Sequence, residues 1–551
     1  MPLEPEPAEP VAQQPAQHVE LMNRLRTAGA SEVNSLDYPK TGMDVDALVT
    51  PQSLGAVASA LKQEHFALDS LVGIDRNPGF EVLYLFKPFT DGPRVRLRAK
   101  AEAEKPELPT LSKVYAGADW YEREIHDMFG VKFTDHPHLR PLLLPHFTNF
   151  YPLRKEFHGA PIVIPDDTVE IPEIDVQEAM KVGQSEGRRR DFFLNMGPQH
   201  PSTHGVLRIL LHVEGEKVLG GRCHLGYSHR GSEKLAEKKQ YVQILPYTDR
   251  MDYLAPLNYN LGYAKLLERA AGIESTPRAE VLRLIMAELG RVASHLVWLG
   301  TYLLDLGAIT PFLYCFEDRE RILTIFERAT GQRMTTSYIV YGGVRNDVYS
   351  EFSSEIANLI KDLRKRMPEY DDLVMSNEIF LQRTDGVGTI SREQAIEFGV
   401  SGPVLRGSGV DYDARRDEPY CDLYQEFEWK VATDPSGDCL GRSRVRMAEL
   451  VQSFNLIEQG LAKLEDGPVR SKVPRIFKVP EGEYFSATEG PRGMLGWYLV
   501  GDGSANPYRL KVRVPSFANL QVVEELIKGM RVADVVSILG SLDVVIPEID
   551  R

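Results

Sequence analysis

The sequence is poor in cysteine and has no closely spaced cysteine pair. Its 551 residues include four cysteines, namely Cys223, Cys315, Cys421 and Cys439, and no two of them form a Cys-x-x-Cys pair. This spacing excludes a disulfide framework, a zinc ribbon and an ordinary iron–sulfur cluster held by this chain alone. We therefore expect a reducing compartment and no metal ion bound by the chain itself.

Excess positive charge and long apolar runs are also missing. The formal net charge is −15, which argues against a general nucleic-acid binder because phosphate binding needs clustered Lys and Arg. The longest apolar-looking stretch, Val281 to Leu306, is interrupted by Glu288, Arg291 and His295, so it is too short to span a bilayer. Neither GxGxxG nor a P-loop occurs. We expect a soluble chain without a nucleotide-binding fingerprint.

The length and the local composition predict several domains. Residues 1–20 are rich in Pro, Glu, Gln and Ala and predict a disordered tail. Residues 21–157 alternate helix-like and strand-like segments, which is typical of a small α+β domain. Residues 158–190 carry scattered Pro and Gly and predict a linker. Residues 191–551 predict a large, mainly helical domain that opens with two strands and ends in a mixed segment. The expected fold class is α+β.

Periodicity locates the main elements. Expected helices cover residues 51–64, 120–128, 276–305, 317–329, 354–365 and 446–464, and expected strands cover residues 68–75, 81–87, 95–100, 191–196 and 206–213. The clearest helix starts at Thr276-Pro277, where Thr can cap and Pro suits the first helical position. Two neighbouring faces of this helix are largely apolar, which predicts burial inside a bundle. Glu288, Arg291 and His295 on one face predict a satisfied buried polar network.

Three stretches have residue patterns that the periodicity of helices and strands does not explain. Residues 197–205 (GPQHPSTHG) place two histidines between two expected strands, which predicts a hairpin tip with proton-active side chains. A histidine at a loop tip is more often exposed and inert, so this stretch alone leaves both interpretations open. The second stretch is residues 224–234 (HLGYSHRGSEK), followed by residues 250–253 (RMDY). The third is residues 543–551 (DVVIPEIDR).

Together these stretches resemble the D-type subunit of NADH:quinone oxidoreductase, a relative of the [NiFe]-hydrogenase large subunits. The likeness continues through residues 303–308 (LLDLGA), 405–413 (LRGSGVDYD) and 504–517 (SANPYRLKVRVPSF). It spans essentially all of residues 191–551.

The first part of the chain has its own signature. Residues 120–130 (WYEREIHDMFG), 136–140 (HPHLR) and 152–155 (PLRK) are similar to the C-type subunit of the same enzyme. A C-type part before a D-type part is the fused arrangement found in some bacteria. The whole sequence therefore resembles a fused C/D-type subunit of respiratory complex I.

The hydrogenase comparison tests this resemblance. A [NiFe] site needs two Cys-x-x-Cys thiolate pairs, because soft thiolates hold nickel and iron. The corresponding stretches here, residues 227–231 (YSHRG) and 543–547 (DVVIP), contain no cysteine. We expect that no metal is bound there and that the former catalytic cavity is free to accept another molecule.

The resemblance implies that a quinone headgroup lies between His204 and Tyr253. Both residues can donate a hydrogen bond and then a proton, which lowers the cost of negative charge on a reduced quinone. Asp305 matches the family's partner of the histidine, where it would hold the imidazole protonated and pass on its change of charge. The alternative for Asp305 is an ordinary surface residue at a helix end.

Other residues are assigned by the same resemblance. Arg230 matches an arginine beside the [4Fe–4S] cluster of a small B-type partner, where a fixed cation would raise the cluster's potential. A surface salt bridge is the alternative for Arg230. The resemblance also implies that the cofactor-binding set includes His200, Met251 and Arg551.

The implied function is that of a peripheral-arm subunit in a proton-pumping quinone oxidoreductase. Expected partners are the B-type iron–sulfur subunit, other peripheral-arm subunits and an H-type membrane subunit, at the cytoplasmic face of a bacterial inner membrane. A ferredoxin-dependent relative remains open, because the electron-input module lies on other chains. A structural adaptor without chemistry is a third hypothesis. His204, Tyr253 and Asp305 together argue against it, because an adaptor has no use for three proton-active groups at one site.

One departure from the family concerns the stretch after Met334. Many relatives carry a histidine near the cluster there and an arginine slightly further on, whereas this chain has Thr335, Thr336 and then Val340. Threonine takes up no proton and valine carries no charge, so the reduced cluster should be less stabilised. We therefore expect a cluster of lower and less pH-dependent potential, suited to a low-potential quinone such as menaquinone.

Overall fold

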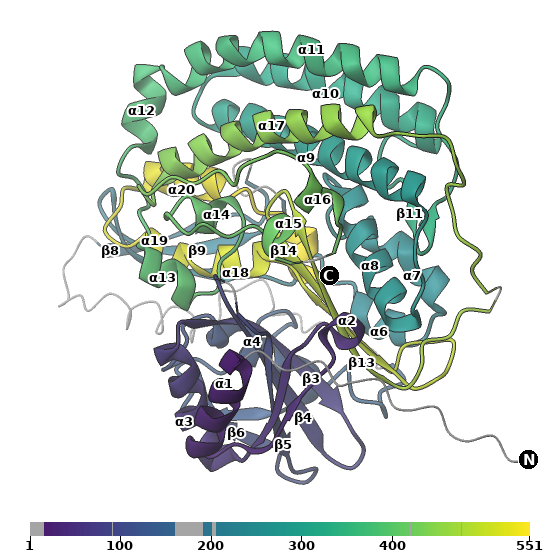
Figure 1. Cartoon of the computed structure of the whole chain (residues 1–551). Coiled ribbons are helices and arrows are strands. Elements are labelled where there is room, and N and C mark those ends of the chain that lie inside the picture. Colours follow the sequence, from purple (N-terminus) through teal and green to yellow (C-terminus); the bar gives the residue numbers. More distant parts are fainter. Residues whose placement is uncertain (1–15, 91, 160–190, 201–204, 419, 475) are drawn as a thin grey trace, which may run out of the picture.

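The protein has an α+β fold, as the sequence predicts, with helices and sheets in both halves of the chain (Figure 1). The computed structural model describes residues 16–90, 92–159, 191–200, 205–418, 420–474 and 476–551. We call residues 16–159 the N-terminal part and residues 191–551 the C-terminal part. The predicted linker, residues 158–190, lies almost wholly outside the described residues, and this boundary stays a prediction.

The N-terminal part is built on a five-stranded sheet. Its strand order is β1 (Ser31–Ser35), β2 (Val45–Val49), β5 (Val95–Ala101), β4 (Phe80–Pro88) and β3 (Phe66–Asp75). β2 and β5 run parallel, and the other neighbours are antiparallel. The expected strands 68–75, 81–87 and 95–100 are confirmed as β3, β4 and β5.

Helices α1 (Ala16–Thr27) and α3 (Pro51–Gln63) pack against this sheet. α3 begins as predicted, because Thr50 and Ser53 form a capping box and Pro51 occupies the first helical position. α1 begins inside the stretch whose composition predicts no packing. Its side chains Leu21 and Leu25 join the core, and this apolar face explains the helix.

Helix α4 (Ala118–Phe129) carries the predicted helix at residues 120–128 and is buried on almost every side. Gly130, in a left-handed conformation with φ of 76°, ends the helix. The Asp127 carboxylate accepts hydrogen bonds from the backbone N–H groups of Leu142, Leu143 and Leu144. Asp127 of α4 therefore fixes the backbone of the loop at residues 142–144. The short elements of this part are α2 (Tyr38–Thr41), β6 (Glu107–Pro109) and β7 (Lys132–Thr134).

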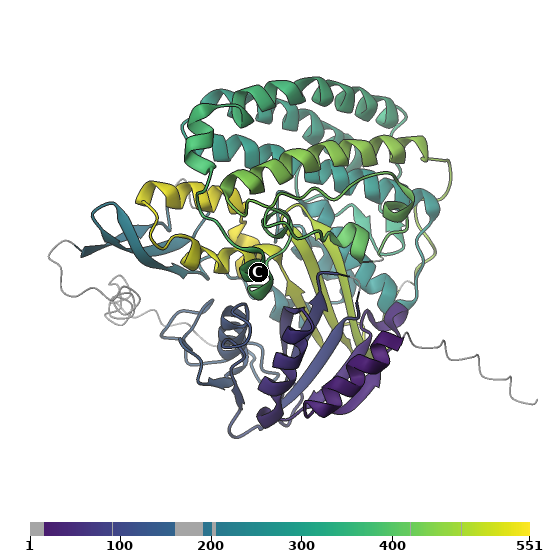
Figure 2. The ribbon, with the colours of Figure 1, turned by 60° about the vertical axis from the view of Figure 1, so that its left-hand side comes forward.

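The C-terminal part opens with a three-stranded antiparallel sheet that extends from the body of the molecule (Figure 2). β8 (Asp191–Met196) pairs with β9 (Arg208–Glu214), and β9 pairs with β10 (Lys217–His224). The hairpin predicted around residues 197–205 is confirmed by the β8–β9 pairing. Residues 201–204 at its tip lie outside the described residues.

A helical bundle forms the end of the molecule that lies opposite to the N-terminal part (Figure 1). Its long helices are α8 (Pro256–Ala271), α9 (Pro277–Asp305), α10 (Ile309–Thr330), α11 (Phe352–Tyr370) and α17 (Cys439–Ala462). α9 packs against α8, α10 and α17 and is buried along its length, as its two apolar faces predict. Gly331 ends α10 in a left-handed conformation.

The expected cap of α9 is wrong in one detail. Thr276 occupies the N-cap position, but its hydroxyl donates to the Pro468 carbonyl at 2.6 Å and makes no capping bond. The connection that follows α17 therefore takes the hydroxyl group that would otherwise cap the helix.

Shorter elements complete the C-terminal part. They are α6 (Ser232–Glu237), α7 (Tyr241–Thr248), β11 (Ile339–Val340), β12 (Gly343–Val344), a π-helical turn (Asp371–Met375), α12 (Glu378–Thr384), α13 (Arg392–Glu397), α14 (Pro403–Arg406), α15 (Ala414–Asp417), α16 (Leu423–Glu426), β13 (Gly482–Gly490), β14 (Gly493–Gly501), β15 (Arg509–Arg513), α18 (Pro515–Gln521), α19 (Val523–Leu526), α20 (Val532–Leu542) and α21 (Ile546–Asp550).

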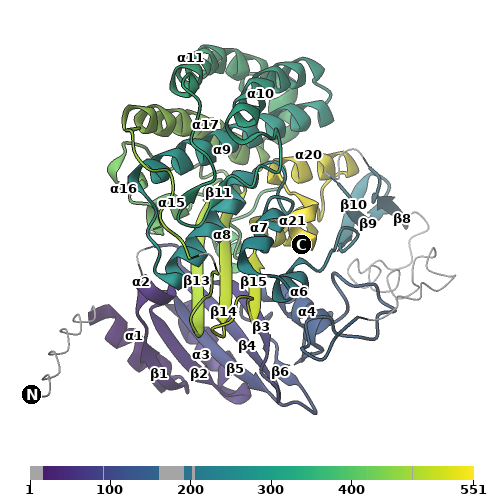
Figure 3. The ribbon, with the colours of Figure 1, turned by 90° about the vertical axis from the view of Figure 1, so that its right-hand side faces the viewer.

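The β13–β14–β15 sheet packs against the N-terminal sheet (Figure 3). Val72 and Leu83 of the N-terminal sheet share a core cluster with Phe485 and Tyr498 of the other sheet. Because α1 and α3 cover the opposite face, β3 and β4 are buried on both faces and show no alternation of polar and apolar residues. The two parts therefore share one continuous core.

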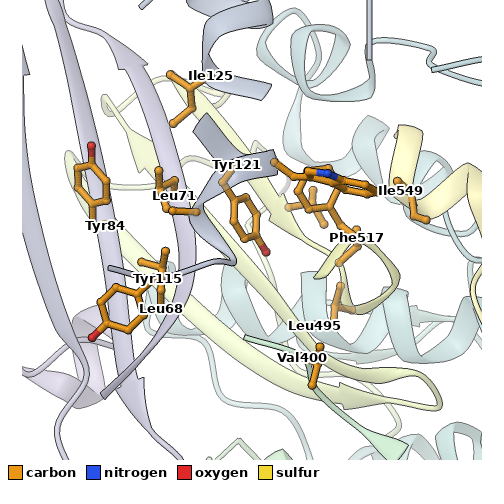
Figure 4. Packing of buried hydrophobic residues seen from close by; sticks show 14 of the residues in the cluster. Leu68, Leu71, Tyr84, Tyr115, Tyr121, Ile125, Val400, Leu495, Phe517 and Ile549 are labelled. Carbon is orange, nitrogen blue, oxygen red and sulfur yellow. The ribbon is translucent and has the colours of Figure 1, made fainter. Parts of the chain in front are cut away.

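Aromatic rings close the contact between α4 and the C-terminal part (Figure 4). The ring centroid of Phe517 lies 5.6 Å from that of Trp120 and 5.0 Å from that of Tyr121. Ile549, near the end of the chain, lies in the same cluster. In the described ranges, no helix combines the length and the apolar character needed to cross a membrane.

The polar groups predicted on α9 form a buried network, as expected. Glu288 contacts Arg291 at 3.2 Å and Arg415 at 3.2 Å, and it accepts a hydrogen bond from the Tyr424 hydroxyl at 2.8 Å. His295 contacts Glu449 at 3.0 Å. Burial lowers the pKa of His295, and the Glu449 partner opposes this shift.

Replacing Glu288 tests how strongly this network supports the bundle. Glu288→Ala leaves the buried Arg291 guanidinium without its carboxylate partner and removes one of the two carboxylates that contact Arg415, so the free energy of unfolding should fall by about 3–5 kcal/mol. The matched control is Glu458→Ala, which removes a half-exposed ion pair with Arg364 and should cost ~0.2–1 kcal/mol. Urea unfolding followed by circular dichroism compares the two variants, and equal losses would contradict the buried network's role.

Candidate functional site

The second and third of the unusual stretches meet in the structure. The Asp550 carboxylate accepts hydrogen bonds from the backbone N–H groups of Gly226 at 2.9 Å and Ser228 at 2.8 Å. Arg230 donates to the Arg250 carbonyl at 2.8 Å. The stretches at residues 224–234, 250–253 and 543–551 are therefore joined, although most of the helical bundle separates the last two along the chain.

A buried chain of charges supports the turn that carries Tyr253, between α7 and α8. Arg492 donates to Asp252 at 2.6 Å, and its other terminal nitrogen lies 3.4 Å from the Asp543 carboxylate. All three side chains are buried. Asp252 also accepts hydrogen bonds from the N–H groups of Leu254 and Ala255, at 3.1 and 3.3 Å. Asp252 thereby fixes the backbone on the C-terminal side of Tyr253.

The turn between β13 and β14 positions Arg492. The next residue, Gly493, has φ of 134° and lies so close to Ser401 and Gly402 that a Cβ atom would clash with both. The Arg492 carbonyl accepts a hydrogen bond from Asn519 at 3.1 Å. The guanidinium group is therefore held by the fold, rather than by its ion pairs alone.

Burial dominates the electrostatics of this site. Burial raises the pKa of Asp252, while Arg492 opposes that shift. Burial also raises the pKa of Tyr253, and the nearby Arg492 lowers it again in part. For Glu548, burial and then the neighbouring Asp252 raise the pKa to about 7. Glu548 accepts a hydrogen bond from Tyr259 at 2.7 Å.

A second arginine lies behind Asp543. Arg446 donates to the carbonyl groups of Ser541 at 2.7 Å and Leu542 at 3.1 Å, and its Nε lies 4.0 Å from the Asp543 carboxylate. Its guanidinium group stacks over the Trp298 ring at 4.7 Å. Burial lowers the pKa of Arg446 to about 10. The end of α20 is thus tied to the bundle.

The predicted site residues differ in exposure. Met251 is buried, Tyr253 is half-buried, and within the described residues no hydrogen bond engages the Tyr253 hydroxyl. Arg230 and His200 are exposed. His204 lies outside the described residues. Its predicted role therefore stays a prediction.

Asp305 and Arg551 occupy different surroundings. Asp305 is half-buried at the last position of α9, and its predicted role also stays a prediction. Arg551 is buried, and its guanidinium group contacts Glu124 and Glu233 at 2.8 and 3.2 Å. The cofactor role assigned to Arg551 stays a prediction, and these side-chain contacts lie within the protein.

Sequence reasoning missed the charged support of the site. The motifs assign no role to Arg492 or Asp252, and they include Asp543 and Glu548 without giving either a function. The available signal was weak: Arg492 follows Gly-Pro and precedes an apolar run at residues 494–500 (MLGWYLV), where an unpaired charge would be costly. Such a position predicts a buried partner without identifying it.

The described residues contain no group of three or more His, Cys, Asp and Glu side chains that could hold a metal ion. The geometry offers a half-buried phenol, Tyr253, next to a buried chain of carboxylates and guanidinium groups. Such an arrangement can donate a hydrogen bond, or a proton, to an acceptor that develops negative charge.

Comparison with known proteins finds relatives for both parts of the chain. Residues 47–162 match the family described as respiratory-chain NADH dehydrogenase, 30 Kd subunit. Residues 305–477 and 471–551 match the family described as respiratory-chain NADH dehydrogenase, 49 Kd subunit.

Individual relatives extend the match. The D-type subunit of the NADH-quinone oxidoreductase from Syntrophobacter fumaroxidans is 50% identical over 361 residues, which are 65% of this chain and 96% of that protein. The corresponding protein of Geobacillus thermodenitrificans is 48% identical over 364 residues, 66% of this chain and 99% of its own length. The protein of Geobacter sulfurreducens is 43% identical over 383 residues, 65% and 98% of the two chains.

These matches place a 30 kDa-type segment and a 49 kDa-type segment in one polypeptide, in the order that the motifs predict. The chain belongs to the respiratory-chain NADH:quinone oxidoreductase family, as a fusion of the C-type and D-type subunits of complex I.

Proposed function

We propose that this chain forms the protein side of a quinone-reduction cavity and protonates the reduced quinone. The observation that carries the proposal is the half-buried Tyr253, whose hydroxyl is uncommitted among the described residues and whose turn is fixed by the Asp252–Arg492 ion pair. The relatives, which are named as NADH-quinone oxidoreductase subunits, support quinone as the substrate.

Two proton donors suit this chemistry. Reduction of a quinone to a quinol takes two electrons and two protons, and a positioned acid lowers the cost of the negative charge that develops on the quinone oxygens. Tyr253 and His204 are the proposed donors. A [4Fe–4S] cluster of the B-type partner would supply the electrons.

Asp305 is the proposed recipient of the charge change when His204 loses its proton. Its place at the end of α9 links that change to the longest helix of the bundle. Leu304, Ile309 and Leu313 are exposed apolar side chains around the same helix junction. These side chains support a docking face for the proposed H-type membrane subunit, at the cytoplasmic side of a bacterial inner membrane.

The exposed loop at residues 227–230 supports a docking site for the B-type partner. Tyr227 is about half-exposed and Arg230 is exposed, although the backbone of the loop is firmly held. A rigid loop with exposed side chains is typical of a preformed interface. Other peripheral-arm subunits are further proposed partners.

The quinone is proposed to be of low potential, such as menaquinone. Thr335 is half-buried, with φ of 49°, and Thr336 and Val340 are buried. None of the three side chains takes up a proton near pH 7. A titratable group close to this stretch is Asp249, which accepts a hydrogen bond from the Ser337 hydroxyl; burial raises its pKa. Lower stabilisation of the reduced cluster supports a low-potential acceptor.

Tyr253→Phe is the direct test of the proposed proton donor. Only a hydroxyl is lost, so the complex should assemble, while quinone reductase activity should fall by about 10²–10⁴-fold. The control is Tyr263→Phe, which removes a buried hydroxyl bonded to the Tyr241 carbonyl on the neighbouring helix. The measurement is the steady-state quinone reductase activity of both complexes. Wild-type activity in Tyr253→Phe would contradict the proposed role of Tyr253 and favour the structural-adaptor hypothesis.

Asp305→Asn separates proton coupling from quinone binding. The substitution removes a charge but nearly keeps the shape, so the apparent affinity for quinone should change little while fewer protons are pumped per electron. Proton uptake in proteoliposomes, measured together with electron transfer, gives this ratio. Asp362→Asn on the surface of α11 is the control. An unchanged ratio in Asp305→Asn would exclude the proposed relay.

A redox titration followed by electron paramagnetic resonance (EPR) tests the low-potential cluster. In the wild-type complex the midpoint potential should be nearly independent of pH. Thr335→His should couple reduction of the cluster to proton uptake, because an imidazolium forming beside the added electron stabilises it. The slope of the potential should then approach about 59 mV per pH unit between the pKa values of this histidine in the oxidised and the reduced state. A steep slope in the wild-type complex would contradict the account. Quinone extraction from the source membrane tests the choice of menaquinone.

A further inference from the structure

The end of the chain holds the exposed loop at residues 226–232 by several independent contacts. The Asp550 carboxylate accepts hydrogen bonds from two backbone N–H groups and from the Ser228 hydroxyl at 2.8 Å. The Asp550 carbonyl lies 2.6 Å from His229 Nδ1. The Arg551 carbonyl accepts hydrogen bonds from the N–H groups of Arg230 at 3.2 Å and Ser232 at 3.3 Å. The backbone that presents Arg230 therefore follows any movement of Arg551.

A close approach from the N-terminal part supports the same loop. Gly226 has φ of 90°, and a Cβ atom at this position would lie 2.0 Å from the Leu143 carbonyl oxygen. Only glycine allows this contact between the loop and the N-terminal part. Lys234, just after the loop, donates to the Arg154 carbonyl at 2.9 Å.

The Arg551 side chain is anchored between the two parts of the chain. Its guanidinium group lies 2.8 Å from Glu124 of α4 and 3.2 Å from Glu233 of α6. It also stacks over the Phe517 ring at 5.3 Å and donates to the Val512 carbonyl at 2.8 Å. Glu124 is the carboxylate that the N-terminal part contributes to this anchor.

The charges in this cluster make Glu124 necessary. Arg509, Lys511 and Arg551 are three buried cations, and their ion-pair partners are Glu124 and Glu233. Lys511 contacts Glu124 at 2.5 Å. Without Glu124, the three cations would share Glu233 as an ion-pair partner in a medium that screens poorly, and Arg551 would be repelled by Lys511. The repulsion would displace the residue that holds the loop.

We propose that Glu124 is a positioning residue for electron transfer: it holds Arg551 from across the domain interface, and through Arg551 it sets where Arg230 lies. The inference rests on the proposed function, in which Arg230 lies beside the partner's [4Fe–4S] cluster. It assigns the C-type part a role in tuning that cluster.

Glu124→Gln in the purified complex tests the proposal through the partner's cluster. The substitution keeps the shape of the side chain but removes its charge. We expect a changed EPR line shape and a downward shift of the cluster's midpoint potential, because the cation of Arg230 is no longer held in place. Electron transfer to quinone should slow in parallel.

Glu122→Gln is the matched control on the same helix. Glu122 is also buried, but its carboxyl group accepts hydrogen bonds from the Thr110 hydroxyl at 2.5 Å and the Leu111 N–H at 2.6 Å, both within the N-terminal part. Burial raises the pKa of Glu122 to about 8, so glutamine keeps the neutral state that prevails at pH 7. The EPR signal of this variant should match that of the wild-type complex.

Further variants make each outcome decisive. If Glu124→Gln prevents assembly, Glu124→Asp keeps the charge but shortens its reach, and it should produce a smaller shift in the same direction. Arg230→Met tests the proposed position of Arg230 beside the partner's cluster. An EPR signal that is unchanged in this variant would overturn that position. A signal that responds to Arg230→Met but not to Glu124→Gln or Glu124→Asp would overturn the positioning role alone.

Discussion

The geometry of the candidate site depends on the buried ion pair between Arg492 and Asp252. This contact joins the turn between β13 and β14 to the turn between α7 and α8, and Asp543 adds the end of α20. A buried charge without a partner is costly, so the three segments must stay together. Tyr253 is placed by this constraint, because it follows Asp252 directly.

Two loops of the same region are held without any cysteine. Residues 227–231 and 543–547 contain none. The structure holds the first stretch through Asp550 and the second through Arg492 and Arg446. Ion pairs and backbone hydrogen bonds therefore hold both stretches, and Tyr253 is the phenol that we propose for proton chemistry.

Local features of the fold could be predicted from the sequence, and long-range ones could not. The boundaries of α9 follow from Pro277 and from apolar residues spaced three and four positions apart over a long stretch. The start of α3 follows from Thr50 and Pro51. β1, β2 and β10 were missed because they are short or edge strands with weak patterns. The packing of β13–β15 on the N-terminal sheet has no local signature. Contacts such as Asp252–Arg492 and Glu124–Arg551 join residues hundreds of positions apart.

A structure of the assembled complex with a bound quinone analogue tests the central claim most directly. The account predicts density for the headgroup within hydrogen-bonding distance of the Tyr253 hydroxyl, at the turn that Asp252 and Arg492 hold. A headgroup bound elsewhere, with the Tyr253 hydroxyl engaged by protein groups in the complex, would contradict it.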